Sequence, residues 1–389
     1  MEVLNYAYEY NDDSKFASEF KDESDHSLNE DERKNYIRFG SMKVPSDHSN
    51  LLMLGAPGTG KTALLMNLVN DLDKLGKKAI IYDYNGEYVS KFYDPSKDTI
   101  INILDKRGTF INVLESVKTD YDVELTSNIL VKEEDKNIFF VELERIILRR
   151  IINECIKENK LSNTGLFELL DSENVDSIIK DTVDVSQLST KSAIATLRSK
   201  LSWIKYTDNY NFSIDEWVKD SNSRFIFITG NPKVDNIIKS SAYVFIVKVL
   251  SSYKKLNDTY IILDNLTFNH NVPFLDKVIA EGRENRVSIV CSGYELRSMF
   301  SDDRTTIMSY DSLTNFRHFI ILRQNNVENA KSILSKLGNF TIEDELLNLN
   351  DLEIKVKLND VWNNAMIVPN KLESIANNFI FKDDIKQYF

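Results

Sequence analysis

Eight consecutive residues of this chain have the types and spacing of a loop that binds phosphate groups. They follow the Walker A pattern G-x-x-x-x-G-K-[ST] and comprise Gly55, Ala56, Pro57, Gly58, Thr59, Gly60, Lys61 and Thr62. In such a loop the glycines let backbone N–H groups close around a phosphate. Lys61 would reach the β- and γ-phosphates, and the Thr62 hydroxyl would ligate Mg²⁺. The sequence therefore predicts that the chain binds a nucleoside triphosphate, such as ATP, together with Mg²⁺.

The segments on either side of this loop occur in the order that its chemistry needs. Residues 51–54 are all apolar, as in a buried strand, and apolar residues recur at helical spacing from 64 to 75. A helix that begins at the loop directs the positive end of its dipole at a bound phosphate. The alternative is an ordinary glycine turn that matches the pattern by chance, and the strand–loop–helix order argues against it.

A second strand carries a carboxylate that could complete a metal site. Residues 259–265 form an apolar run that closes on Asp264, the pattern of a Walker B strand, whose Asp holds the Mg²⁺ shell. We expect the strands that end at Leu54 and Asp264 to be neighbours in the sheet, with a concavity between their ends. Asp83 and Glu87 follow a further buried-type strand at 78–84; they either line the ligand site or cap local structure.

Strands and helices alternate along most of the chain. Further strands are predicted at 224–230, 286–292 and 317–323, with a terminal hairpin around 353–358 and 364–368 and a turn with an extended connection at 85–105. This alternation predicts an α/β fold with a mainly parallel sheet covered on both faces. Residues 120–215 read as almost continuous helix, which predicts an all-helical domain inserted between 37–119 and 216–389.

Composition sets limits on partners and location. The chain has 389 residues, a net charge of −12 and two cysteines, Cys155 and Cys291, which we expect to be buried, reduced thiols. The acidic balance argues against a surface that coats DNA but leaves room for a local basic channel. The chain has neither an apolar run long enough for a membrane helix nor a signal peptide, so the cytoplasm is the expected location.

Two charged segments have more than one interpretation. Residues 1–36 are acidic and contain several aromatic residues, so they form either a solvated tail or a short docking segment. The helix predicted near residue 200 carries Lys191, Arg198, Lys200 and Lys205. We favour a solvated helix face over a nucleic-acid contact, because acidic residues outnumber basic ones across the helical insertion.

The order of these motifs resembles the coupling proteins of conjugative type IV secretion systems (TraD- and TrwB-like), within the wider group of FtsK- and HerA-type ring ATPases. The resemblance covers about residues 37–369. The segments that carry it are 37–45, the phosphate-binding loop, 82–95, 213–217, 262–264, 282–283 and 315–322.

The resemblance implies a RecA-like P-loop NTPase domain with an all-α domain, assembled as a hexameric ring. Such a ring would use ATP to move DNA, or pass a protein–DNA substrate to a secretion channel, with relaxosome or secretion proteins as partners. Arg283 would be the arginine finger that reaches a neighbouring subunit's γ-phosphate, a role worth about 10³–10⁵ in rate elsewhere. Without the resemblance, Arg283 would be a surface ion-pair residue.

Three departures from the family pattern bear on hydrolysis and location. Asn265 stands where the family has a Glu that polarises the attacking water, and an amide cannot accept a proton at neutral pH. Tyr294 stands where the family has a Gln that senses the γ-phosphate. Glu87, Glu281 or Glu284 could supply a displaced carboxylate. The family's N-terminal membrane helices are missing, so the chain is either tethered near the inner membrane by a partner or a truncated member.

Three functional hypotheses follow from these motifs and departures. The first is an ATP-binding coupling-protein-like ring subunit for DNA or substrate transfer, with impaired hydrolysis. The second is a non-hydrolysing ATP-binding scaffold that organises protein partners. The third is a DNA-packaging or DNA-processing ATPase of a mobile element. The intact loop, Asp264 and Arg283 favour a motor, whereas Asn265 and Tyr294 favour a scaffold.

Overall fold

One large sheet organises the molecule. The computed structural model describes residues 36–45, 48–132, 138–207, 212–230, 235–265, 272–300, 307–338, 343–358, 361–368 and 372–382. Within these residues, ten strands form a single sheet and β1 (Tyr36–Phe39) and β2 (Met42–Pro45) form a separate hairpin.

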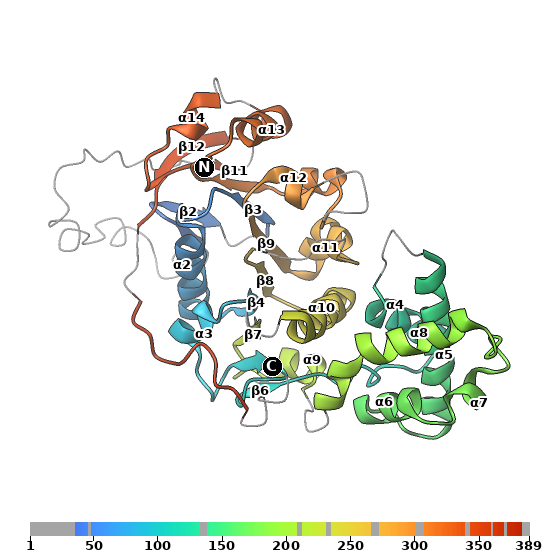
Figure 1. Ribbon diagram of the computed structural model, residues 1–389. Helices are drawn as coiled ribbons and strands as arrows, with labels where there is room; N and C mark the ends of the chain where they lie inside the picture. The colour runs from blue at the N-terminus through green and yellow to red at the C-terminus, as the bar shows by residue number, and fades with distance from the viewer. Residues whose placement is uncertain are drawn as a thin grey trace.

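The sheet is parallel except at one edge (Figure 1). Its strands from β10 to β6 run parallel, and β11 and β12 pair antiparallel beside β10. The prediction of an α/β RecA-like P-loop fold with a mainly parallel sheet is therefore confirmed. In spatial order the strands are β12 (Val361–Met366), β11 (Glu353–Leu358), β10 (His318–Ile321), β3 (Leu51–Leu54), β9 (Val287–Gly293), β8 (Thr259–Leu263), β4 (Lys78–Asp83), β7 (Phe225–Thr229), β5 (Thr99–Ile101) and β6 (Gly108–Thr109).

Helices cover both faces of this sheet, which explains why its central strands are apolar throughout. Every residue of β3, β7, β8 and β9 is buried. Along β3 the side chains alternate between two cores: Leu51 and Met53 join the core under α2 (Lys61–Lys74) and α3 (Glu87–Phe92), and Leu52 and Leu54 join the other. The second core lies under α10 (Asp235–Ser251), α11 (Leu275–Glu281) and α12 (Leu296–Met299). Figure 1 shows these two groups of helices on opposite sides of the sheet.

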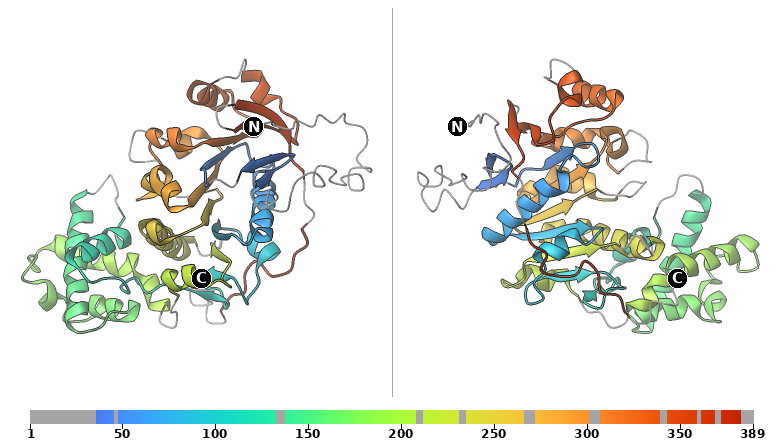
Figure 2. Two further views of the ribbon diagram at one scale, coloured as in Figure 1. Left: turned by 180° about the vertical axis from the view of Figure 1, so that it is seen from behind. Right: turned by 60° about the vertical axis from the view of Figure 1, so that its left-hand side comes forward.

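A group of helices stands beside the sheet, next to β5, β6 and α10 (Figures 1 and 2). It comprises α4 (Asp120–Leu130), α5 (Ile138–Lys157), α6 (Asn163–Asp171), α7 (Val175–Ile179), α8 (Leu188–Lys200) and the 3₁₀ segment η2 (Ser202–Tyr206); α9 (Ile214–Lys219) then leads to β7. Aromatic rings join the group to α10, because the Phe110 ring lies 5.3 Å from the Trp203 ring and 6.2 Å from the Phe245 ring. The described residues from 120 to 207 contain no strand.

The basic residues of α8 and η2 serve partly to hold this helical group together. Arg198 Nε donates to the carbonyl of Leu170 at 3.0 Å, and Lys200 Nζ donates to Glu144 at 2.9 Å. Lys191 and Lys205 are exposed. Two of the four cations therefore bind neighbouring helices.

Two features between β4 and the C-terminus differ from the expected pattern. The short helix α3 lies where a turn and an extended connection were predicted, so that prediction is wrong for residues 87–92. Residues 372–382, which we call the C-terminal strap, run in an extended conformation along α3 to the β6 edge of the sheet (Figure 1).

Both cysteines are buried and free, as predicted. Among the residues that the structure describes, no helix combines the length and apolar character needed to cross a membrane.

Candidate nucleotide and metal site

The phosphate-binding loop lies at the carboxyl end of β3 and opens directly into α2. Gly58 has φ 76° and Gly60 has φ 99°, a left-handed backbone that glycine adopts at little cost. The N-cap residue of α2 is Gly60, which has no side chain to accept from the first backbone N–H groups of the helix and so leaves them to a ligand. A Cβ at Gly58 would have no atom within 4 Å. The loop therefore offers donors and open space on one side, the arrangement that fits a phosphate group.

Lys61 lies almost completely buried inside the loop. Its Nζ donates to the carbonyls of Gly55 at 2.7 Å and Ala56 at 2.9 Å. The same nitrogen lies 4.4 Å from the centre of the Tyr294 ring, a cation–π contact. Burial lowers the pKa of Lys61 to about 8, although the nearby Asp264 carboxylate opposes this shift. In this structure, two carbonyls of the loop and one aromatic ring therefore contact the Lys61 ammonium group, which the sequence predicts to bind a phosphate.

Three hydroxyl groups surround the Asp264 carboxylate at the end of β8. Thr62 Oγ1 donates to Asp264 Oδ2 at 3.0 Å, and the Tyr88 hydroxyl donates to the same oxygen at 2.8 Å. Ser292 Oγ donates to Asp264 Oδ1. Asp264 is 8% exposed, so these donors replace most of the water that a carboxylate would otherwise bind.

The expected adjacency of the two strands is wrong. β9 lies between β3 and β8 in the sheet. The two segments still meet, because the first turn of α2 carries Thr62 over the end of β9. Ser292 and Gly293 are the last residues of β9, and Ser292 Oγ itself donates to Asp264. Strand adjacency was therefore too strict a criterion, since contact depends on the helix that follows the loop.

The residues at this site fit a magnesium ion bound to a triphosphate. Mg²⁺ prefers oxygen ligands and is held by one or two carboxylates, waters and substrate phosphates rather than by a full protein cage. Thr62 and Asp264 supply such oxygens beside the loop. The described residues contain no group of three or more His, Cys, Asp or Glu side chains that could hold a metal by themselves.

Asn265 follows Asp264 and keeps its predicted place beside the site. It adopts a left-handed backbone with φ 52°, which Asn tolerates better than most residues. Its backbone N–H donates to Ser292 Oγ at 3.0 Å. Its Oδ1 is buried and has no hydrogen-bond partner within the described part of the chain. A buried amide oxygen without a partner is an acceptor that a water molecule at the site could satisfy.

Tyr294 follows β9 immediately and lies over the loop. Its side chain is 45% exposed, and its ring covers Lys61. The structure thus brings together Lys61, Thr62, Asp264, Asn265 and Tyr294, which come from three separate segments of the sequence. Only β3, β8 and β9, with the start of α2, are needed to position all of them.

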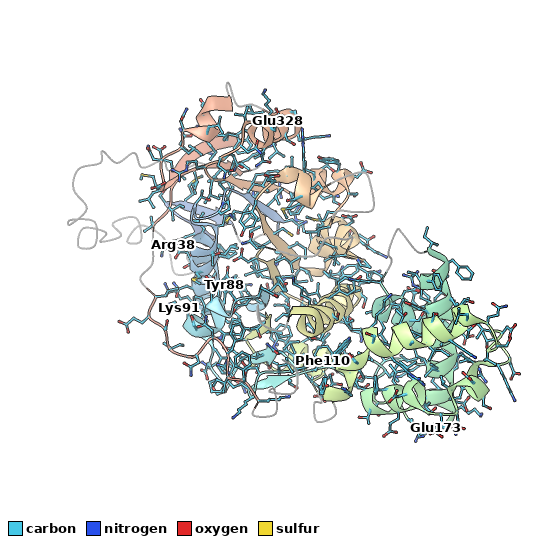
Figure 3. All side chains as sticks on the ribbon, viewed as in Figure 1. Arg38, Tyr88, Lys91, Phe110, Glu173 and Glu328 are labelled. Atoms are coloured by element: carbon cyan, nitrogen blue, oxygen red, sulfur yellow. The ribbon has the colours of Figure 1, made fainter. Side chains whose placement is uncertain are left out.

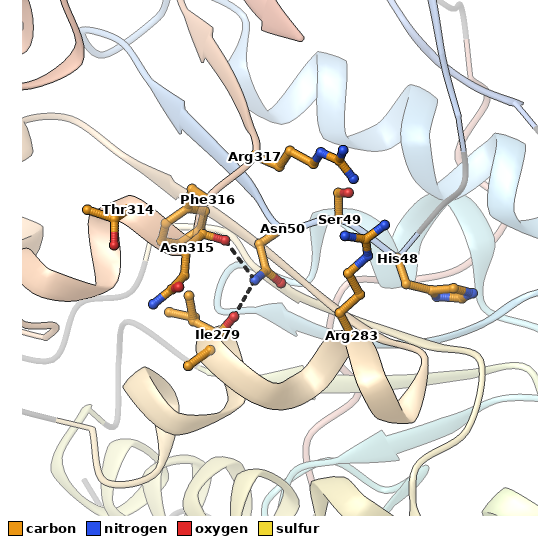
Figure 4. A pocket seen from close by; sticks show the side chains of 10 residues that line it. His48, Ser49, Asn50, Ile279, Arg283, Thr314, Asn315, Phe316 and Arg317 are labelled. Atoms are coloured by element: carbon orange, nitrogen blue, oxygen red, sulfur yellow. Dashed lines mark hydrogen bonds between the residues drawn. The ribbon is translucent and has the colours of Figure 1, made fainter. Parts of the chain in front are cut away.

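Arg283 lies at the amino-terminal ends of the central strands, whereas the phosphate-binding loop lies at their carboxyl ends. It belongs to the 3₁₀ segment η4 (Gly282–Asn285), which precedes β9, whereas the loop follows the end of β3 beside Gly293 at the end of β9. There Arg283 lines a cavity of about 460 Å³ together with Asn50 and Arg317 (Figure 4). Asn50 fixes this region, because its Nδ2 donates to the carbonyls of Ile279 and Asn315. Within one chain, Arg283 therefore cannot meet the phosphate-binding loop.

The three candidate replacement carboxylates lie at opposite ends of the strands. Glu281 accepts a hydrogen bond from the Tyr253 hydroxyl, and Glu284 belongs to η4. Both therefore lie beside Arg283, before the start of β9. Neither can therefore supply a carboxylate to the loop of its own chain. Glu87 is exposed at the start of α3, which follows the carboxyl end of β4 just as the loop follows the carboxyl end of β3. Asn85 Nδ2 contacts its Oε1 at 3.4 Å.

Sequence reasoning missed two of the three donors to Asp264. Ser292 could have been found, since it is a hydroxyl residue near the end of a predicted strand, two residues before Tyr294. Tyr88 had no such signal, because it belongs to a helix that was not predicted. Burial, with nearby Asp264, raises the pKa of Tyr88 well above 10, so the phenol remains a donor. Asp83 is buried and caps α3, since its Oδ2 accepts the Val89 N–H at 2.8 Å.

Comparison with known proteins identifies a family that this chain matches. Residues 38–368 match the family described as the type IV secretion-system coupling protein DNA-binding domain. Coupling protein TraD of Escherichia coli (strain K12) is 21% identical over 283 residues, which cover 66% of this chain and 40% of TraD. The chain thus spans about two fifths of the length of that relative.

Solved structures of the plasmid coupling protein TrwB have the same fold. TrwB in complex with the ATP analogue ADPNP is 19% identical, with a TM-score of 0.75 over 90% of this chain and 92% of that one. TrwB in complex with ADP and Mg²⁺ is 18% identical, with the same TM-score and the same coverage. Because the family match extends over most of the chain, this protein belongs to the family of type IV secretion-system coupling protein DNA-binding domains.

Proposed function

We propose that this chain binds ATP with Mg²⁺ at the phosphate-binding loop and acts as a coupling-protein ring subunit in type IV secretion or conjugation. The observation that supports this most directly is the contact between Thr62 and Asp264, 202 residues apart in the sequence, beside an uncapped helix N-terminus. The nucleotide complexes of TrwB give the same ligands to a protein of the same fold.

The proposed roles follow from the chemistry of each side chain. Backbone N–H groups of residues 55–62 would bind the phosphates, and Lys61 would leave its carbonyl partners to reach the β- and γ-phosphates. Thr62 and Asp264 would hold Mg²⁺, which neutralises charge on the phosphate oxygens when bound. Asn265 would orient a water through its free Oδ1, and Tyr294 would lie beside the γ-phosphate.

The proposed assembly is a homo-oligomeric, hexameric ring. Arg283 supports it, since the arginine could act only in a neighbouring chain's site, from its position at the amino-terminal end of β9. The division into a RecA-like domain (37–119 and 216–389) and an inserted helical domain (120–215) belongs to the same proposal. DNA, relaxosome and secretion proteins are the proposed partners, and contact with the inner membrane would come through one of them.

A steady-state ATPase assay with and without single- and double-stranded DNA tests the motor. We expect DNA-stimulated turnover in the wild-type protein and its loss in Lys61→Ala, because the lysine charge would stabilise the transferring phosphoryl group. Lys74→Ala is the matched control, an exposed lysine at the other end of α2. Equal turnover in wild type and Lys61→Ala would contradict the proposal.

A non-hydrolysing ATP-binding scaffold is the second candidate, and Asn265 favours it. An amide next to Asp264 cannot take the proton of an attacking water. Under this hypothesis the wild type binds ATP without turnover, and Asn265→Glu gains turnover. Asn265→Gln is the control, because it has the length of Glu without the carboxylate. DNA-stimulated hydrolysis by the wild type would remove the scaffold hypothesis.

A further inference from the structure

We infer that Tyr88 is a positioning residue for the metal site, whose hydroxyl fixes the orientation of the Asp264 carboxylate for a nucleotide-bound divalent cation. This inference rests on the proposed function and names a residue that no motif assigns. It begins with a single contact, the hydrogen bond from the Tyr88 hydroxyl to Asp264 Oδ2 at 2.8 Å. The Tyr88 side chain is 1% exposed, so the bond is shielded from water.

The three hydroxyls around Asp264 have different tasks. Thr62 and Tyr88 share Oδ2, and Ser292 holds Oδ1. A threonine hydroxyl that ligates Mg²⁺ must turn from the carboxylate towards the metal. With Ser292 on one oxygen and Tyr88 on the other, Asp264 remains fixed at both oxygens when Thr62 turns away. Groups that orient a metal ligand in this way typically contribute 10- to 100-fold in metal affinity.

Tyr88 can do this because α3 is fixed from both sides. On the sheet side, buried Asp83 accepts the backbone N–H of Val89 at 2.8 Å. On the outer side, the backbone N–H groups of Ile375 and Ala376 in the C-terminal strap donate to the carbonyl of Ser90. Figure 3 labels Tyr88 and Lys91 on this helix, below α2.

The strap binds α3 at two further points. Lys91 Nζ donates to the carbonyl of Leu372 and to Ser374 Oγ, each at 2.9 Å. Gly86, with φ 69°, lies so close to the strap that a Cβ there would be 2.8 Å from the carbonyl oxygen of Asn378. A helix of six residues does not hold its shape alone, so these contacts place the Tyr88 ring.

The test is a titration of the 389-residue chain with a fluorescent ATP analogue, in Mg²⁺ and in EDTA. For Tyr88→Phe we expect an affinity within about twofold of wild type in EDTA, and a Mg²⁺ requirement for tight binding that is about 10- to 100-fold higher. Mn²⁺ binding to the nucleotide complex, followed by electron paramagnetic resonance, should weaken by the same factor. Both readouts report metal binding without turnover.

The matched control is Tyr253→Phe. It removes another tyrosine hydroxyl that donates to a carboxylate, that of Glu281, which lies near the amino-terminal end of β9 and away from the phosphate-binding loop. Its Mg²⁺ requirement should equal that of wild type. Lys91→Met is a second variant that leaves Tyr88 intact and loosens α3 from the strap. It should raise the Mg²⁺ requirement, and it keeps the inference testable if Tyr88→Phe does not fold.

The outcomes separate this inference from the proposed function. A wild type that binds no nucleotide would overturn the proposed function itself. A wild type that binds nucleotide with Mg²⁺, beside a Tyr88→Phe with the same Mg²⁺ requirement, would overturn only the role of Tyr88. Equal loss of affinity in Mg²⁺ and in EDTA would also overturn it, because the hydroxyl would then support the fold rather than the metal.

Discussion

At the scale of single residues, Lys61 is held in the free protein by the loop that it is expected to serve. The carbonyls of Gly55 and Ala56 accept its Nζ, and the Tyr294 ring covers it. These partners carry no full negative charge, and burial therefore lowers the pKa of Lys61 to about 8. A bound triphosphate would reverse this shift, since a nearby negative charge favours the protonated amine.

Binding of ATP should therefore take up a proton above pH 8. At pH 8.5 much of the free protein has a neutral Lys61, and the bound form needs it charged, so affinity should fall as the pH rises through 8. Calorimetric titration in two buffers of different ionisation enthalpy measures the uptake directly. We expect most of one proton at pH 8.5 and much less at pH 7.5. The absence of uptake at pH 8.5 would show that Lys61 does not meet the phosphates.

At the scale of elements, α3 depends on a buried acid. Asp83 ends β4 and accepts a backbone N–H at the start of α3, so the capping alternative left open by the sequence is confirmed. Burial raises the pKa of Asp83 to about 7, although its backbone hydrogen bonds oppose the shift. The folded state thus holds the Asp83 proton more tightly than the unfolded chain, whose pKa is near 3.8.

Asp83→Asn should change the pH dependence of stability in a defined direction. With a raised folded pKa, the contribution of Asp83 is fully present below the unfolded pKa and is lost as the pH rises towards 7. Asn keeps an acceptor for the Val89 N–H and does not titrate. Relative to wild type, Asp83→Asn should therefore gain about 2 kcal/mol of unfolding free energy between pH 5.5 and pH 8.0. Urea unfolding at the two pH values measures it, and an equal difference at both would be inconsistent with a raised pKa.

At the scale of the whole molecule, the chain after β12 connects the two ends of the sheet. Ile367 lies against the loop, because a Cβ at Gly60 would be 2.8 Å from its Cδ1. Asn67 of α2 donates to the carbonyl of Val368 at 2.8 Å. The strap then passes along α3, and Arg107 Nη1 donates to the carbonyl of Asn377 at 2.8 Å near β6. The described residues after β12 thus contact the loop, α2, α3 and Arg107, which lies just before the edge strand β6.

Removal of the strap should destabilise the protein and weaken its metal site. Deletion of residues 372–389 removes the hydrogen bonds to Ser90, Lys91 and Arg107. We expect the Tm to fall by about 1–3 °C, equivalent to one or two kcal/mol in a chain of this size. The Mg²⁺ requirement for ATP binding should rise as in Tyr88→Phe. Deletion of 383–389 alone is the control, and equal effects of the two deletions would place the stabilising contacts outside the strap.

The sequence by itself determined the elements whose signals are local. The phosphate-binding loop, the helix after it and the strand ending at Asp264 each occupy consecutive residues, so spacing and apolar periodicity reveal them. The alternation of strands and helices likewise determined the α/β fold. The sequence also placed five site residues at the carboxyl ends of strands, where parallel strands bring them to the same side of the molecule. These residues are Lys61, Thr62, Asp264, Asn265 and Tyr294.

Only the tertiary structure decided which segments meet across the sheet. It placed β9 between β3 and β8, Arg283 at the amino-terminal end of β9, and Tyr88 on Asp264, 176 residues away in the sequence. Strand order depends on pairing between distant segments, and no local period records it. The short helix α3 has too few residues for a periodic signal, and packing against Asp83 and the strap stabilises it. Contacts between distant residues, rather than sequence pattern, therefore complete the metal site.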